Sequence, residues 1–145
     1  MGLNKIISIM AIIIISGVFL TGIQAVSAAH TTEIKAYTID PLHFPGKLIN
    51  SVVNIKEGKP FNVVTSLHVD GGKPLWFRSI GFTVIDFQGK VMFNTVSNTI
   101  AGGYAYFFTN SEKWDSGKYI VMVYYLGSET EDYPMAYNVF MLCIK

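Results

Sequence analysis

The chain has very little cysteine: Cys143 is the single one among 145 residues, so no internal disulfide can form. A fold without a cross-link has to be stabilised by its apolar core. Cys143 lies in the apolar string F-M-L-C-I, and we expect it to be a small buried side chain. A disulfide with another molecule, or a nucleophilic role, is the alternative that this position leaves open.

Charged residues are also scarce, at 14% of the chain, and neither sign predominates. Residues 1–29 contain Lys5 and no acidic residue, so removing them leaves ten lysines and arginines against ten aspartates and glutamates. A neutral domain with no basic run has no electrostatic footprint for nucleic acid and no polybasic patch for a membrane surface. We therefore expect no nucleic-acid partner.

The motifs of secreted hydrolases and nucleotide-binding enzymes are absent as well. The sequence contains no G-x-S-x-G, no H-E-x-x-H, no P-loop and no G-x-G-x-x-G. His68 and Asp70 share one face of a predicted strand, but two ligands do not make a metal site, and we interpret them as solvated surface. We expect no enzymatic activity, no cofactor and no metal, and a small secreted enzyme or inhibitor is the least favoured alternative.

One long hydrophobic run stands out at the N-terminus. Residues 6–26 carry no charge, follow one basic residue, and lead into the small-residue string V-S-A-A. This pattern is typical of a secretory signal peptide, here residues 1–29 with a hydrophobic helix, cleaved before His30. The run is also long enough to cross a bilayer, so an uncleaved membrane anchor is the alternative. Either way we expect residues 30–145 to be exported, outside the cell or at its surface, with membrane contact only through residues 6–26.

Beyond residue 29 the sequence alternates regularly between β-prone segments and turn residues. Segments rich in Val, Ile, Thr, Phe and Tyr are separated by Gly, Asp, Asn and Pro, and no stretch shows sustained helical spacing. Short antiparallel strands, seven or eight of them in one domain of this size, favour an all-β sandwich of two sheets. We predict strands near residues 33–39, 51–55, 61–69, 79–86, 90–96, 103–109, 117–126 and 135–144.

The alternation within each segment predicts which side chains are buried. Segment 61–69 has one apolar face and one polar face, so we expect it to be half-buried, whereas segment 117–126 is apolar on both sides and should lie centrally in its sheet. The predicted core consists of Phe61, Leu67, Phe82, Val84, Tyr106, Phe108, Val123 and Phe140.

Several strings carry a family resemblance. F-T-V-I-D-F-Q-G-K-V-M-F-N from Phe82, G-G-Y-A-Y-F, W-D-S-G-K-Y-I-V-M-V-Y-Y-L-G and the closing M-L-C-I-K resemble bacterial and archaeal immunoglobulin-like domains of adhesin-like surface proteins, as does I-K-E-G-K-P-F-N-V at 55–63. The resemblance implies an immunoglobulin-like sandwich that acts at the cell surface. Tyr119 in D-S-G-K-Y then matches a tyrosine corner, whose hydroxyl bonds to backbone a few residues upstream. A tyrosine that only alternates inward, without this bond, is the alternative. Val121 takes the place of the second disulfide cysteine of antibody domains, and the resemblance makes Trp76 the candidate for their buried core tryptophan.

The candidate binding residues surround the connection between the last two predicted strands. The acidic run at 128–132 could hold calcium, but no fixed ligand spacing appears and a solvated loop is the favoured interpretation. Tyrosines nearby, together with Trp114, could form a surface for a protein or polysaccharide, with cross-strand packing as the alternative. The candidates are Tyr124, Glu129, Glu131, Asp132, Tyr133 and Tyr137.

These observations predict an exported, non-enzymatic domain that acts by binding or by structural interaction at the cell surface. A membrane-anchored sandwich, serving as an accessory or subunit of a surface filament or envelope layer, is the second interpretation.

Overall fold

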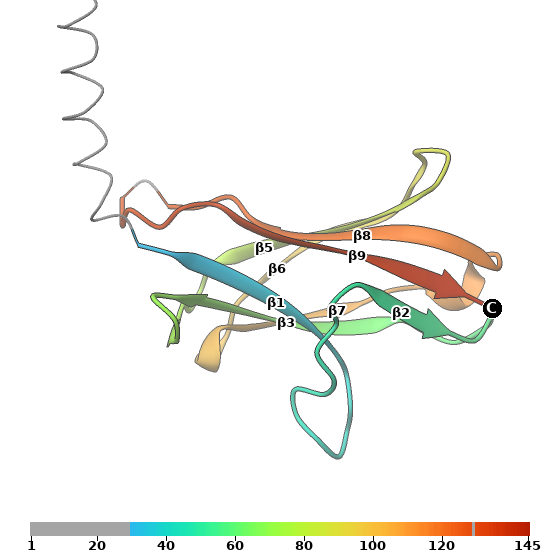
Figure 1. The fold of residues 1–145 in the computed structure, drawn as a ribbon, viewed down its shortest axis with the longest axis horizontal. Coiled ribbons are helices and arrows are strands. Elements are labelled where there is room, and N and C mark those ends of the chain that lie inside the picture. The colour runs from blue at the N-terminus through green and yellow to red at the C-terminus, as the bar shows by residue number, and fades with distance from the viewer. Residues whose placement is uncertain (1–29, 129) are drawn as a thin grey trace, which may run out of the picture.

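The computed structural model describes residues 30–128 and 130–145, which form two β-sheets packed face to face (Figure 1). The predicted signal helix lies outside these residues, and none of the helices within them is long and apolar enough to span a membrane. The strands are β1 (Thr32–Thr38), β2 (Val52–Ile55), β3 (Asn62–Val69), β4 (Lys73–Pro74), β5 (Ser79–Asp86), β6 (Val91–Asn98), β7 (Tyr104–Phe108), β8 (Gly117–Tyr125) and β9 (Ala136–Ile144), with short 3-10 turns η1 (Ala101–Gly103) and η2 (Ser111–Lys113).

The all-β prediction is confirmed, and each predicted strand is present to within a few residues. The strand that the prediction missed is β4, whose two residues follow the turn that begins at Asp70. A strand this short has no alternating pattern of its own, because alternation needs several residues to be recognised. It exists because the chain turns back onto β3, where Lys73 pairs with Val69.

The strands divide between the sheets as in an immunoglobulin domain. In the four-stranded sheet, β3 lies between β1 on one side and β7 and β4 on the other. The five-stranded sheet has the order β2-β9-β8-β5-β6. Immunoglobulin strands A, B and E likewise form one sheet and C, F and G the other, and β6 extends the second sheet as strand C′ does in variable domains. As predicted, β8 lies in the middle of its sheet.

The expectation of wholly antiparallel sheets is wrong at β2, which runs parallel to β9. Val52 pairs with Met141 and Ile55 pairs with Ile144, and further backbone bonds extend the pairing at both ends. The connection from β2 leads to β3 in the other sheet, so β2 takes the free edge of β9 rather than a hairpin partner. Because β2 and β9 are far apart in sequence, no turn determines their relative direction.

The core lies between the sheets, and six of the eight predicted core side chains are buried there. The other two, Tyr106 and Phe108, do not belong to the core: Tyr106 is half-buried and Phe108 is 65% exposed. Strand β7 uses the opposite phase, so that Ala105 and Phe107 point inward and the Phe107 ring stacks on Phe82 at 4.7 Å. The segment Y-A-Y-F-F has large side chains in both phases, so alternation alone could not decide between them.

The tryptophan prediction is also wrong, because Trp76 is exposed and Trp114 is the buried one. The Trp114 ring lies 5.5 Å from the ring of Tyr119, and its indole Nε1 donates to Asn110 Oδ1 at 3.1 Å. The tyrosine corner is confirmed, since the Tyr119 hydroxyl donates to the Asp115 carbonyl at 2.6 Å. Burial, more than the nearby acidic groups, raises the pKa of Tyr119.

Strand β3 is buried on both faces rather than half-buried, because Val64 and Ser66 on its outer face are covered. Their neighbours on the same face are large: Val64 lies between Tyr37 of β1 and Tyr106 of β7. Phe44, from the long loop between β1 and β2, then packs against Tyr106 at 6.2 Å. The polar face predicted for this strand is therefore mostly removed from water.

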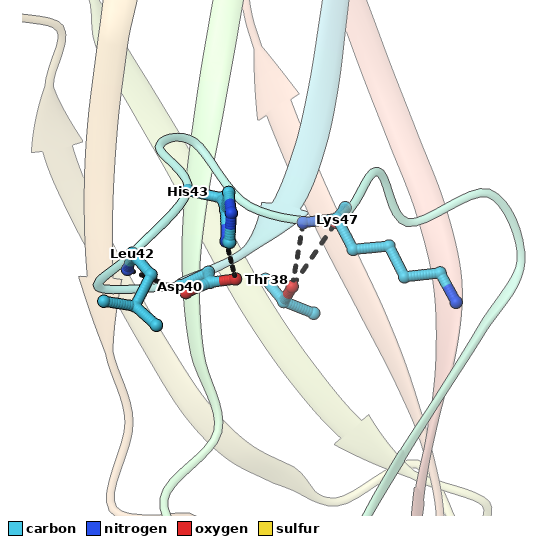
Figure 2. A network of polar contacts seen from close by, with 5 residues as sticks. All are labelled: Thr38, Asp40, Leu42, His43 and Lys47. Carbon is cyan, nitrogen blue, oxygen red and sulfur yellow. Dashed lines mark hydrogen bonds and ion pairs between the residues drawn. The ribbon is translucent and has the colours of Figure 1, made fainter.

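The loop between β1 and β2 extends away from the five-stranded sheet (Figure 1) and is held by local polar contacts (Figure 2). The Leu42 amide donates to the Asp40 carboxylate at 2.8 Å, and this bond, more than the contact with His43, holds the pKa of Asp40 below its ordinary value. At the far end of the loop, the Lys47 amide donates to the Thr38 hydroxyl at 3.2 Å. These contacts fix the loop whose Phe44 covers the tyrosines of β7.

Candidate functional site

The outer face of the five-stranded sheet is largely apolar and nearly free of charge, with neutral polar residues on β5 and β6 at Ser79, Thr83, Asn94 and Asn98. Strand register places alternate residues of its five strands on this face. Among the described residues that lie on this face, a single one is charged, Lys118 at one end of the face. A contiguous exposed apolar surface of this kind marks an interaction site in soluble domains. We call this surface the apolar face; its exposed or half-buried members are Val52, Ile85, Val91, Val96, Ile120, Met122, Tyr124, Tyr137, Val139 and Met141.

Two predicted binding residues, Tyr124 and Tyr137, lie side by side on the apolar face. They are register partners on β8 and β9. The ring of Tyr124 lies across Gly81 of β5, so closely that a Cβ at position 81 would be 2.2 Å from the Tyr124 Cζ. Glycine there leaves room for the ring to lie against the sheet. Tyr137 is 72% exposed, and the pair forms an aromatic cluster at the end of the apolar face that lies next to the loop between β8 and β9.

The loop between β8 and β9 adds a hollow at the end of the apolar face, and in Figure 1 it lies beside the start of β1. Backbone bonds between Ser128 and Tyr133, at 2.8 and 3.1 Å, close the loop. Tyr133 is half-buried, packs against the core and approaches the ring of His30 edge-on at 5.2 Å. The hollow has a volume of about 420 Å³ and is lined by Leu126, Gly127, Ser128, Asp132, Tyr133, Pro134 and Met135.

The acidic residues of this loop do not gather into a site. Glu131 forms an ion pair with the guanidinium of Arg78, which lies before β5 and far from it in sequence. Asp132 is exposed at the rim of the hollow, with a positive φ of 56° that aspartate tolerates better than most residues. Glu129 lies outside the described residues. Within the described residues, no three histidine, cysteine, aspartate or glutamate side chains come together as metal ligands would.

Arg78 connects the loop to the buried end of β8. The Arg78 amide donates to the Thr99 hydroxyl at 2.9 Å, which fixes the start of the side chain. Tyr125 is buried beside this group, and burial raises its pKa, although the charge of Arg78 acts in the opposite direction. In the described part of the chain, neither the Tyr125 hydroxyl nor Arg78 Nε has a hydrogen-bond partner. The Arg78–Glu131 pair therefore fixes this loop at a polar, partly dehydrated position.

The structure separates some predicted residues and brings others together. Tyr124 and Tyr137 share the apolar face, while Asp132 and Tyr133 line the hollow next to it. Trp114 is not part of this surface, because it precedes β8 and is buried at the opposite end of that strand from the hollow. The exposed aliphatic residues of the apolar face were not among the predicted binding residues. Their signal in the sequence was a strand with apolar residues on both sides, a pattern that the last strand shares with segment 117–126.

The possible pairing of His68 with Asp70 is not what the structure shows. Asp70 instead lies 2.6 Å from the Nδ1 of His30 and accepts from the Thr31 amide at 3.2 Å. These contacts, the one with His30 first, hold the pKa of Asp70 below its ordinary value. His68 is half-buried on the other sheet, where burial and the charge of Lys35 lower its pKa.

Comparison with known proteins finds similarity to solved structures but none at the level of sequence families. No protein-family model matches the sequence, and no curated protein matches it. The chain is similar to a tetra-tandem repeat in the extending region of a large adhesion protein, with a TM-score of 0.50 and 10% identity over 81% of this chain and 24% of that chain. It is also similar to the CARDB domain of a Pyrococcus furiosus protein in complex with two metal ions, with a TM-score of 0.39 and 12% identity over 80% and 87% of the two chains. At 10% identity the adhesion-protein repeat shares the fold alone with this β-sandwich.

Proposed function

We propose that residues 30–145 form an exported, non-enzymatic immunoglobulin-like domain that binds a surface protein of the cell through the apolar face. The observation that carries the proposal is the apolar face itself, with Tyr124 and Tyr137 at one end of it, next to the hollow. Export is supported by the signal-like pattern of residues 1–29. Fold similarity to a repeat of a large adhesion protein is consistent with a surface role.

Composition and size favour a protein partner. The centres of protein interfaces are depleted of charge and enriched in tyrosine and methionine, and the apolar face has this composition in Tyr124, Met122 and Met141. Five strands about 4.8 Å apart, with roughly seven residues each at about 3.3 Å per residue, cover on the order of 500 Å². With an equal area on the partner, the interface reaches the ~1,000 Å² that a specific complex requires.

A polysaccharide partner is the second candidate, supported by how Tyr124 lies. Its ring lies over Gly81 on the outer face of the sheet, and an aromatic ring at such a surface can stack on a sugar ring. Amide and hydroxyl groups that can bond to sugar hydroxyls lie on β5 and β6, where Thr83 donates to Asn94 at 3.0 Å and Ser79 to Asn98 at 2.9 Å.

The test is crosslinking in the producing cells from a photoreactive residue placed at Tyr137 of the full chain. The matched control places the same residue at Leu42, which is exposed on the loop between β1 and β2. A protein partner on the apolar face gives a defined crosslinked protein from position 137 and none from position 42. Val139→Glu, in the centre of the face, should then abolish the product.

The polysaccharide candidate replaces the protein one if position 137 gives no protein adduct and the domain instead sediments with cell-wall polysaccharide. Tyr124→Ala should then abolish this cosedimentation.

Export and anchoring are tested separately. Mass spectrometry of the native protein, with an N-terminus at His30, would support cleavage and a released domain. Carbonate-resistant membrane association of a protein that retains residues 6–26 would instead favour the anchored subunit of a filament or envelope layer.

A further inference from the structure

Strand β6 is the outermost strand of the five-stranded sheet. Its neighbour is β5, in a register that runs from Ser79↔Asn98 to Ile85↔Val91. In the described part of the chain, no other strand pairs with β6, and no further backbone bond reaches residues 91–98. The backbone groups on its other side therefore face outward, and such a row is a template for another strand.

The other sheet edges of the described residues are protected in ways that β6 is not. Along β1, segment 47–49 supplies backbone partners: the Thr38 amide donates to Lys47 and the Ile49 amide donates to Ala36. Strand β2 has four residues and β7 has five, and Phe44 packs on the tyrosines of β7. Shortness and covering loops are the usual means by which an edge avoids pairing with another chain.

The sequence of β6, V-M-F-N-T-V-S-N, contains none of the residues that block strand addition. Its eight residues include no charge and no proline. The one irregularity in its pairing with β5 lies between Val84 and Ile85, next to the start of β6, so residues 93–98 form a regular, unprotected edge. An exposed, uncharged edge of this length predicts a strand partner.

We propose that β6 pairs antiparallel with β6 of a second copy of this chain, joining two five-stranded sheets across a two-fold axis. An uncharged edge allows this, because two identical edges meet without like-charge repulsion. The same ladder of hydrogen bonds satisfies both copies, as a two-fold contact requires. Asn94 and Thr95 lie at the middle of β6, where neutral polar side chains can bond to their counterparts, and the exposed Val96 gains a cross-strand neighbour.

This contact has a consequence for binding. A two-fold axis that joins the edges of two sheets runs perpendicular to them, so the apolar faces of both copies lie on the same side of the dimer. Two faces on one side bind a surface with repeated partners more tightly than one face does. The edge contact itself does not depend on what the apolar face binds, because it uses backbone groups of β6.

The test is sedimentation equilibrium of the exported protein together with two lysine variants. Val96→Lys places a charge beside the proposed contact. Val139→Lys is its matched control on β9, an inner strand of the same sheet; the native valines are 63% and 48% exposed. We expect a dimer in the native protein and in Val139→Lys. Val96→Lys should raise the dissociation constant at least about tenfold, because like charges on paired strands destabilise the pairing.

A second measurement does not depend on the folding of any variant. Hydrogen exchange of the native protein at rising concentration should slow at the outward amides of β6 and leave the loop between β1 and β2 unchanged. A protein that stays monomeric, or β6 amides protected equally at every concentration, would overturn the proposal. So would a dimer that Val139→Lys dissociates and Val96→Lys does not, since that result assigns self-association to the apolar face.

Discussion

The hydroxyl of Tyr119 donates a 2.6 Å hydrogen bond to the backbone carbonyl of Asp115, four residues upstream. This bond ties the start of β8 to the turn before it, where Trp114 packs on the Tyr119 ring. The position two residues later, a cysteine in antibody domains, is the fully buried Val121. In this domain a local hydrogen bond and core packing stabilise the region without a cross-link.

Replacing Tyr119 by phenylalanine should lower the free energy of unfolding by about 0.5–1.5 kcal/mol, the net worth of one hydrogen bond. The ring remains to pack against Trp114, so the loss reports the hydroxyl alone. Urea denaturation measures it, with Tyr137→Phe on the exposed apolar face as the control that should change little. An unchanged midpoint for Tyr119→Phe would contradict a stabilising corner.

The stability of the domain should fall as the pH rises above about 10. Burial raises the pKa of Tyr119 and of Tyr125, so the folded state holds their protons more tightly than the unfolded state does. The stabilisation is present below the unfolded pKa of about 10 and is lost as the pH rises through the folded pKa. Denaturant unfolding between pH 9 and pH 12 tests this. The loss should be smaller in Tyr119→Phe, and an equal loss in that variant would argue against a contribution from Tyr119.

Gly81 and Tyr124 should be energetically coupled. A Cβ at position 81 would enter the Tyr124 ring, so Gly81→Ala displaces the ring and should cost about 1–3 kcal/mol, as overpacking does. In a Tyr124→Ala background most of this cost should disappear, giving a coupling of at least about 0.5 kcal/mol. Gly72→Ala, where an added Cβ meets open space, is the neutral control. Additive costs of Gly81→Ala and Tyr124→Ala would mean that the ring does not occupy this position.

The Arg78–Glu131 pair should contribute little to global stability. Its side chains are 28% and 44% exposed, so solvent screens the attraction, and Glu131→Gln should cost less than about 1 kcal/mol and less still at high salt. Glu112→Gln is the control, because Glu112 forms no ion pair with any described residue. Thermal unfolding at two salt concentrations provides the measurement. A loss above about 2 kcal/mol would show a buried, unscreened pair.

Much of the fold could be predicted from the sequence because its signals are local. Strand positions follow from alternation and turn residues, and the corner at Tyr119 follows from a five-residue string. The phase of β7 could not be predicted, because both of its faces carry large side chains. The same ambiguity at β8 and β9 concealed the apolar face, since a strand that is apolar on both sides does not show which side is covered.

The candidate site was predicted in part. Tyr124 and Tyr137 are neighbours on the sheet, as a tyrosine surface requires, and Tyr133 and Asp132 share the hollow beside them. Glu131 turns instead to Arg78, from which it is separated by 53 positions in the sequence. A partner at that distance leaves no local signal.

The sequence by itself determined the strands, the tight turns, the balance of charge and the tyrosine corner, because each depends on residues within a few positions of one another or on simple counts. Only the tertiary structure decided that β2 runs parallel to β9, that Trp114 rather than Trp76 is buried, and that β6 is left as an open edge. These outcomes depend on which distant segments meet across and between the two sheets, and alternation within a strand is compatible with more than one such pairing.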